Sequence, residues 1–143
     1  VFNGDVFRTG DIGYYQRIDN KKFFFIKGRI KEIVKRYGKL VYLSEIEMQL
    51  KKYFKNTPFA VCSFENIYSG EEIGIVTESI DSINYDDIKS HLFDNFPPHK
   101  RVKVLLIAPL CLTSTLKPKR KEMAQYFKKY FKVHIKEDDL IVN

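Results

Sequence analysis

Three short segments carry side chains that could bind a nucleotide or another anion. In the first, Arg-Thr-Gly-Asp at 8–11, Asp11 follows a glycine turn and could accept hydrogen bonds from both hydroxyls of a ribose. In the second, Gly-Arg at 28–29, Arg29 follows an apolar strand segment and could reach a phosphate or a ribose. An ordinary Asx turn and a solvated basic hairpin would explain the same residues, so neither segment establishes a site by itself.

The third segment is the threonine- and lysine-rich run Leu-Thr-Ser-Thr-Leu-Lys-Pro-Lys at 112–119. Thr113 and Thr115 precede Lys117 and Lys119 on an expected loop ahead of a helix. A lysine on an extended loop can carry a mobile point charge into a site that is distant in sequence. A basic cluster leading into a helix, or a nucleic-acid patch, would have the same composition.

The hydrophobic pattern places these segments on an α+β scaffold. Asp19-Asn20 separates two strands, at 11–18 and 21–27, which predicts a hairpin. After Gly28 the pattern predicts strands at 32–36, 39–43, 59–64, 72–78 and 101–108. It also predicts three helices: one begins at Ser44, one begins at Asn84, and the last spans about 119–131. We therefore expect a small α+β domain with a central, mainly antiparallel sheet flanked by about three helices. We expect a β-hairpin, the remnant of a larger domain, to precede it.

Each predicted helix has an apolar face, and the first two have capping signals. Ser44 with Glu47 forms a capping box, and Asn84 with Asp87 is a similar start. Pro97-Pro98 ends the second helix. The expected apolar faces are Ile46, Leu50, Tyr53 and Phe54; Tyr85, Ile88, Leu92 and Phe96; and Met123, Phe127, Tyr130 and Phe131.

Composition limits the class of protein and the sign of its partner. Hydrophobic residues make up 44% of the 143 residues, enough to form a core. The net charge of +7 suits a polyanionic partner, although a lysine-rich solvated face explains it equally well. Cys62 and Cys111 lie in apolar runs, which is typical of reduced core residues in a cytoplasmic protein. The three histidines are scattered, so we expect no metal site, and we expect no signal peptide and no transmembrane segment.

Four motifs occur in a fixed order: Arg-Thr-Gly-Asp at 8–11, Gly-Arg-Ile-Lys-Glu at 28–32, the glycine loop and helix start at 37–47, and Thr-Leu-Lys-Pro-Lys at 115–119. This set resembles the adenylate-forming (AMP-binding) enzymes, which include acyl-CoA synthetases, luciferases and the adenylation domains of peptide synthetases. The resemblance covers essentially the whole chain. The last motif is most similar to the form found in long-chain acyl-CoA synthetases.

The resemblance implies roles for four residues outside the last motif. Asp11 would bind the ribose hydroxyls of ATP and of the acyl-adenylate, and Arg29 would contact the ribose or a phosphate. Lys31 would lie at the hinge about which the small C-terminal domain moves between the two half-reactions. Gly38 would line the tunnel for the pantetheine thiol.

The resemblance also implies a catalytic lysine, which would bridge the carboxylate and the α-phosphate during adenylation. The offset from Thr115 favours Lys119, and Lys117 is the alternative. Thr113 and Pro118 depart from the family pattern, which has proline and glycine at these positions. Because of these departures, either Lys117 or Lys119 could be the catalytic lysine. Leu43 replaces a proline before the helix, which we expect to be harmless.

The resemblance further implies that residues 1–28 are the trailing hairpin of the large N-terminal adenylation domain and that residues 29–143 are the mobile C-terminal domain. The whole enzyme would use ATP and Mg²⁺ to activate a carboxylic acid, with a fatty acid expected. It would then transfer the acyl group to the thiol of coenzyme A or to the phosphopantetheine of an acyl carrier protein. The fragment alone, without its N-terminal domain, is expected to be inactive.

Two other functions remain open, a basic RNA-binding module and a carrier-protein-docking module without catalysis. Abundant aromatic residues and a lysine-rich last helix favour RNA binding. However, an RNA-binding sheet presents aromatic side chains outward, and the phenylalanines of Lys-Lys-Phe-Phe-Phe at 21–25 are expected to belong to a core strand. We therefore expect no nucleic-acid partner.

Overall fold

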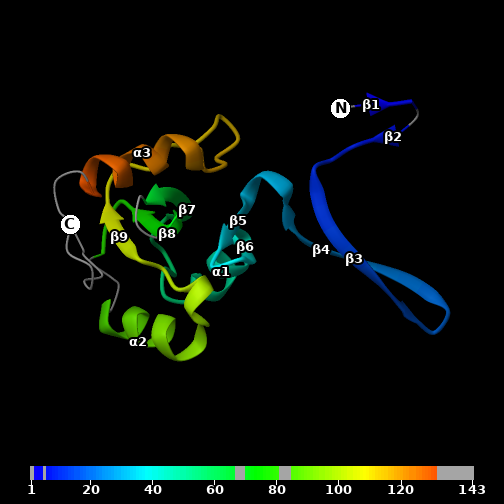
Figure 1. Ribbon diagram of the computed structural model, residues 1–143, viewed down its shortest axis with the longest axis horizontal. Coiled ribbons are helices and arrows are strands. Elements are labelled where there is room, and N and C mark those ends of the chain that lie inside the picture. Colours follow the sequence, from blue (N-terminus) through cyan, green and yellow to red (C-terminus); the bar gives the residue numbers. More distant parts are fainter. Residues whose placement is uncertain (1, 5, 67–69, 81–84, 132–143) are drawn as a thin grey trace.

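The computed structural model describes residues 2–4, 6–66, 70–80 and 85–131 (Figure 1). The strands are β1 (Phe2–Asn3), β2 (Val6–Phe7), β3 (Asp11–Ile18), β4 (Lys21–Arg29), β5 (Ile33–Arg36), β6 (Lys39–Tyr42), β7 (Phe59–Asn66), β8 (Gly70–Thr77) and β9 (Val104–Ile107). The helices are α1 (Leu43–Leu50), α2 (Tyr85–Asn95) and α3 (Arg120–Phe131), with 3₁₀ turns η1 (Ile30–Glu32) and η2 (Pro98–Lys100). This order confirms the predicted α+β fold.

The β3–β4 hairpin projects away from the rest of the molecule (Figure 1). Its two-residue turn is the predicted Asp19-Asn20, with φ values of 49° and 61°. Two positive φ values in succession match the twist of a hairpin, and Asn and Asp adopt them at low cost. The turn therefore explains why the two strands pair antiparallel.

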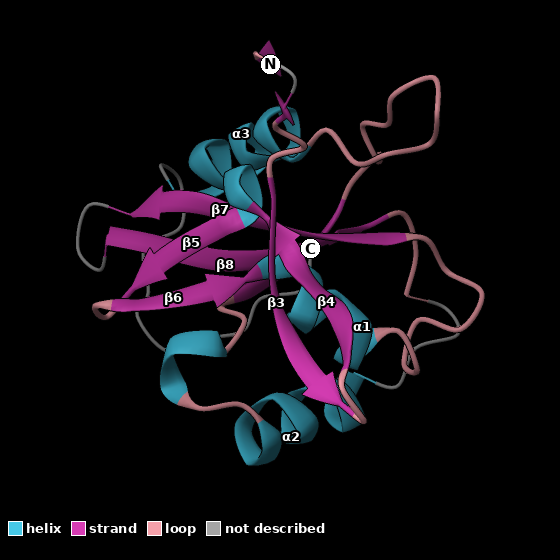
Figure 2. Ribbon diagram, turned by 90° about the vertical axis from the view of Figure 1, so that its right-hand side faces the viewer, coloured by secondary structure: helices cyan, strands magenta, loops and turns pink. Residues whose placement is uncertain are grey.

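The centre of the fold is the three-stranded sheet β7-β8-β9, in which β7 and β8 are antiparallel and β8 and β9 are parallel. The strands β5 and β6 form a separate antiparallel pair. Figure 2 shows the strands between α3 on one side and α2 on the other. The helix α3 covers one face of the sheet, and α1 and α2 cover the opposite face.

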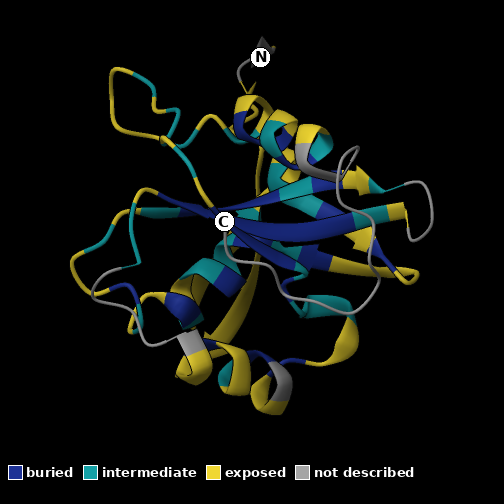
Figure 3. Ribbon diagram, turned by 90° about the vertical axis from the view of Figure 1, so that its left-hand side faces the viewer, coloured by how far each residue is buried: buried dark blue, intermediate teal, exposed yellow. Residues whose placement is uncertain are grey.

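Alternation along the strands supplies a core on each face of this sheet. Val61 and Ile75 pack with Ile46 of α1 and Ile88 of α2. Their strand neighbours face α3, where the buried cluster contains Ala60, Cys62, Val76, Met123 and Phe127. Because both faces are covered, consecutive residues of each strand are apolar and buried, as at 60–62, 73–76 and 104–106, and Figure 3 shows the strands buried between the helices.

The predicted capping box at the start of α1 is wrong. The helix begins at Leu43, and no side chain caps it. Ser44 Oγ instead donates to the Lys27 carbonyl at 3.2 Å, which ties the helix to the base of the hairpin. Glu47 accepts a hydrogen bond from the Val61 amide at 2.9 Å and pairs with Arg120. Stronger partners outside the helix thus replace the local cap.

Most of the predicted apolar faces are confirmed. Ile46 and Leu50 are buried on α1, while Tyr53 and Phe54 follow the helix end and pack against the same core. Ile88, Leu92, Phe96, Met123 and Phe127 are buried on or next to α2 and α3. The Asn84 cap and the side chains of Tyr85, Tyr130 and Phe131 lie outside the described residues.

The expectation that the phenylalanines of 21–25 lie in a core is wrong for this chain. Phe23 and Phe25 are more than a third exposed, and Phe24 is 75% exposed. They sit on a two-stranded hairpin that no other described element covers.

Cys62 is buried and Cys111 is half-buried, and both are free thiols. In the part of the chain that the structure describes, no helix is long and apolar enough to cross a membrane.

Candidate functional site

Asp11 and Arg29 lie opposite each other at the base of the hairpin. An unbroken ladder counted from the turn would place Gly28 opposite Asp11, but a register shift between Ile12 and Gly13 moves Arg29 into that position. Arg29 Nε is 3.3 Å from Asp11 Oδ1, and the Arg29 side chain is 57% exposed. The two predicted nucleotide-binding residues thus form one solvent-accessible carboxylate–guanidinium pair.

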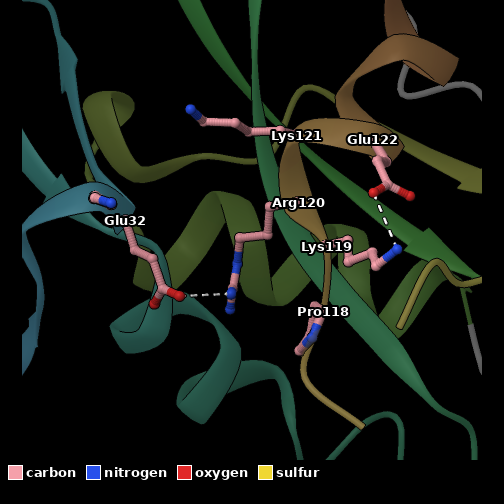
Figure 4. Close-up of a pocket in the computed structure, with 7 residues that line it drawn as sticks. Glu32, Pro118, Lys119, Arg120, Lys121 and Glu122 are labelled. Atoms are coloured by element: carbon pink, nitrogen blue, oxygen red, sulfur yellow. Dashed lines mark hydrogen bonds and ion pairs between the residues drawn. The ribbon is translucent and has the colours of Figure 1, made fainter. Parts of the chain in front are cut away.

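The connection from the hairpin to β5 is the short turn η1, which contains Lys31. The Ile30 amide donates to the Gly10 carbonyl at 2.8 Å, so the start of this turn is fixed to the hairpin base. Lys31 and Glu32 line a surface hollow of about 280 Å³ together with the segment Pro118–Glu122 (Figure 4). The predicted hinge residue therefore shares one hollow with the end of residues 112–119, which we call the lysine loop.

The lysine loop is closed on itself. Leu112 and Pro118 form a bridge, and the Thr113 amide donates to the Lys117 carbonyl at 2.9 Å. Thr113 Oγ1 accepts from the Lys117 amide at 3.1 Å and lies 3.0 Å from Thr115 Oγ1. The threonines thus organise the loop that presents the lysines.

Lys117 and Lys119 have different surroundings. The Lys119 amide donates to the Cys111 carbonyl at 2.8 Å, and the Lys119 carbonyl accepts from the Glu122 and Met123 amides at the start of α3. Lys119 Nζ is 3.2 Å from Glu122 Oε1. Lys117 is exposed, and no acidic side chain within the described ranges pairs with its ammonium. Lys117 therefore carries the less neutralised charge of the two.

Gly38 lies at the turn between β5 and β6, where Tyr37 and Gly38 have φ values of 49° and 74°. A Cβ at Gly38 would meet nothing within 4 Å in the described chain. The left-handed backbone, and not a close contact, is what favours glycine here.

Arg120 is a central residue that the sequence reasoning missed. Its Nη1 donates to Glu32 Oε1 at 2.9 Å (Figure 4), and its Nη2 donates to both carboxylate oxygens of Glu47 at 2.8 Å. Its Nε donates to the Val61 carbonyl at 2.9 Å. We call Arg120, Glu32, Glu47 and Val61 the Arg120 bridge. A partial signal was present, because Glu32 lies in the second motif and Arg120 directly follows the fourth, and neither charged residue had an assigned role.

The Arg120 bridge lies next to the buried thiol of Cys62. Burial raises the pKa of Cys62 to about 12, Arg120 acts in the opposite direction, and Glu47 adds to the rise. The thiol is therefore protonated at neutral pH and is not a nucleophile. Among the described residues, no group of three or more His, Cys, Asp or Glu side chains could hold a metal ion.

No family model matches the chain. Acyl-CoA synthetase FUM10 of Gibberella moniliformis is 27% identical over 122 residues, which cover 85% of this chain and 22% of that protein. The 4-coumarate–CoA ligase CCL1 of Humulus lupulus is 34% identical over 104 residues, which cover 71% of this chain and 18% of that protein. The chain spans about a fifth of the length of the curated relatives it matches.

Solved structures show the same fold. The fatty acyl CoA synthetase of Mycobacterium tuberculosis aligns with a TM-score of 0.61 at 22% identity, over 90% of this chain and 26% of that chain. The fold is therefore that of a segment of an adenylate-forming enzyme. In sequence, the chain is similar to acyl-CoA synthetases and CoA ligases, which are acid–thiol ligases, and this confirms the resemblance predicted from the motifs.

Proposed function

We propose that this chain is the C-terminal part of an ATP-dependent acyl-CoA or acyl-carrier-protein synthetase. The observation that carries the proposal is spatial. The Asp11–Arg29 pair, the connector with Lys31 and the lysine loop follow one another around the base of the hairpin and the start of α3. Residues 1–28 would belong to the large domain, and residues 29–143 would move about Lys31.

The proposed chemistry explains the charges at these positions. The Asp11 carboxylate would accept hydrogen bonds from the ribose diol of ATP, and the exposed Arg29 guanidinium fits the ribose or a phosphate. Attack of a carboxylate on the α-phosphate of Mg²⁺–ATP would form the acyl-adenylate and release pyrophosphate, and it brings two anions together. A lysine between them would offset that repulsion and stabilise the transition state.

Of the two loop lysines, we infer that Lys117 is the stronger candidate for this role. The sequence offset favours Lys119, but Glu122 already pairs with the Lys119 ammonium, and the Lys119 backbone begins α3. The exposed Lys117 could extend into a site on another domain at a lower cost, because no ion pair has to be broken.

The second half-reaction would pass the acyl group to a thiol. The thiol belongs to coenzyme A or to the phosphopantetheine of an acyl carrier protein, and the turn at Gly38 would line its path. The relatives named as acyl-CoA synthetase and CoA ligases support an acid substrate and coenzyme A. A fatty acid is the acid we propose, following the long-chain form of the lysine motif.

The test is ATP–pyrophosphate exchange by the complete protein encoded with this chain, using a panel of fatty acids. We expect exchange in the wild type and a loss of about 100-fold or more in Lys117→Ala. Lys129→Ala, an exposed lysine of α3 that does not line the hollow, is the matched control and should retain exchange. Residues 1–143 alone should give none.

Each outcome has a distinct meaning. Loss in Lys119→Ala with exchange retained in Lys117→Ala would return the role to the residue that the sequence offset favours. Exchange retained in both variants would exclude the loop from adenylation. A wild type without exchange on any acid, or exchange by residues 1–143 alone, would overturn the proposal.

RNA binding has one observation in its favour, the exposed aromatic hairpin. Lys22 Nζ lies 5.2 Å from the Tyr15 ring centre, and Lys27 Nζ lies 5.3 Å from that of Tyr14. Bases could stack on such rings beside the cations. Affinity for single-stranded RNA that falls steeply between about 50 and about 200 mM salt would support this second function.

A further inference from the structure

We propose that Arg120 is a positioning residue that makes the hinge segment and the lysine loop move as one unit. The inference rests on the proposed function in two respects, because a lysine of the loop is taken to act in adenylation and Lys31 is taken to be the hinge. The mechanical part of the proposal, that the Arg120 bridge couples two segments, stands on the contacts alone.

The contacts join three elements that are distant in sequence. Glu32 directly follows Lys31 in η1, Glu47 lies on α1, and Val61 lies on β7. Arg120 uses Nη1, Nη2 and Nε on these three partners, and its side chain is only 16% exposed. Glu47 Oε1 also accepts a hydrogen bond from the Val61 amide. The guanidinium is therefore held firmly by α1 and β7, and Glu32 is the arm that extends to the hinge.

The position of Arg120 links Glu32 of the hinge segment to the start of α3. Arg120 is the first residue of α3 and directly follows Lys119, whose carbonyl accepts the first amides of that helix. A rotation at Lys31 would move Glu32 first, and the charge-assisted hydrogen bond to Arg120 would transmit the rotation to the start of α3. The planar guanidinium offers donors in three directions, which a lysine ammonium cannot reproduce in this geometry.

The chain offers a matched pair of variants. Glu32→Gln removes the charge of the hinge arm and leaves the contacts of Arg120 with Glu47 and Val61 in place. Glu65→Gln is the control. Glu65 of β7 pairs with Lys128, which lies on α3 like Arg120, at 3.1 Å, and this pair does not involve the hinge segment. Arg120→Lys tests whether charge without the three-way geometry is enough.

The first measurement is amide hydrogen exchange on the chain itself. The amides of Ile30, Lys119 and Glu122 are hydrogen-bonded on either side of the bridge. We expect Glu32→Gln and Arg120→Lys to raise the exchange of all three together, by about tenfold, and Glu65→Gln to leave them unchanged. A rise at Ile30 alone, with Lys119 and Glu122 unaffected, would overturn the coupling.

The second measurement is pyrophosphate exchange in the complete protein. We expect Glu32→Gln to lower kcat by about tenfold with less than about a twofold change in KM for ATP, because the lysine would reach its position less often. A merely structural role would lower the fraction folded and leave kcat per folded molecule unchanged. An unchanged kcat in an active enzyme would overturn the positioning role. Coupled hydrogen exchange in a protein without any activity would instead refute the proposed function.

Discussion

Most apolar side chains of the β3–β4 hairpin are exposed to solvent, whereas most of those in the body of the molecule, from β5 to α3, are buried (Figure 3). Tyr14 stacks on Phe25 with ring centres 5.1 Å apart, and Tyr15 meets Phe24 across the ladder, yet all four remain more than a third exposed. In the body, Phe64 and Phe127 stack at 4.7 Å and are almost completely buried.

The difference shows that pairing of aromatic residues is not the same as burial. Cross-strand pairs hold the hairpin in register, but two strands have no second layer to exclude water from either face. Exposed apolar surface of this kind marks a contact with another surface. In the proposed enzyme that surface would be the large domain, so the hairpin and the body would derive their stability from different sources.

The largest expected effect tests this contrast directly. Phe127→Ala should lower the free energy of unfolding by about 3–5 kcal/mol, because Phe127 is fully buried against Phe64 and Gly74. Phe24→Ala should change it by less than about 0.5 kcal/mol, because Phe24 is already in water. Urea unfolding of both variants measures the two values. Comparable losses would show that the hairpin is covered in solution.

The next effect comes from charge buried in the body. Arg36 pairs with Glu72 between β5 and β8, and both side chains are almost fully buried. Glu72→Gln leaves the guanidinium buried without its counter-charge, at an expected cost of about 3 kcal/mol. The control Glu65→Gln removes an exposed partner and should cost less than about 1 kcal/mol. Thermal or urea unfolding that ranked the two equally would contradict this assignment.

Features of the hairpin and the body that depend on neighbouring residues could be predicted from the sequence, and features that depend on distant residues could not. The Asp19-Asn20 turn and the strand alternation predicted the hairpin, and the helical apolar faces predicted most of the core, because both signals are local. The capping box at Ser44 and Glu47 failed because Arg120, which is 73 residues from Glu47, binds the carboxylate. The exposure of Phe24 also could not be predicted, since an apolar strand has the same pattern whichever layer covers it.

In the candidate site, too, local sequence patterns did not predict which residues lie together. The motifs identified Asp11 and Arg29 separately, but an ideal ladder would have placed Gly28 opposite Asp11. The register shift that brings the pair together depends on backbone geometry near Gly28, whose φ is 156° and whose missing Cβ leaves room for Ser44 Oγ and Tyr42. The Arg120 bridge depends on four elements, η1, α1, β7 and α3, meeting in space, which no local pattern encodes.

A smaller effect is expected from removing the hairpin altogether. The hairpin contributes no side chain to either buried cluster, and one of its links to the body is the hydrogen bond from Ser44 to the Lys27 carbonyl. A chain that begins at Gly28 should therefore unfold cooperatively, with a loss of about 1 kcal/mol from that bond. Calorimetry on both chains gives the comparison. A non-cooperative transition in the shorter chain would show that the body depends on the hairpin.

The smallest effect is a pH dependence, and it should come from the body because residues 11–29 contain no histidine. His91 on α2 lies between Tyr53 and Phe96, and its Nδ1 is 2.9 Å from the Asn95 side-chain amide nitrogen. An amide N–H that donates to Nδ1 stabilises the neutral ring, because both nitrogens of the charged ring are donors. Burial lowers the pKa of His91, Lys52 lowers it further, and Asp94 partly offsets them.

The sign of the effect follows from these contacts. The unfolded chain takes up a proton as the pH falls below about 6.5, while the folded chain resists it, so the unfolded state binds more protons there. Stability should therefore be fully present above about pH 7 and should decline toward about pH 5.5. Urea unfolding across that range measures the slope, and His91→Gln should reduce it. The pKa of His99 is also lowered, chiefly by burial and then by Lys39 and Lys100, so part of the slope should remain in that variant. If the slope of His91→Gln equalled that of the wild type, the packing of α2 would not respond to the charge of this ring.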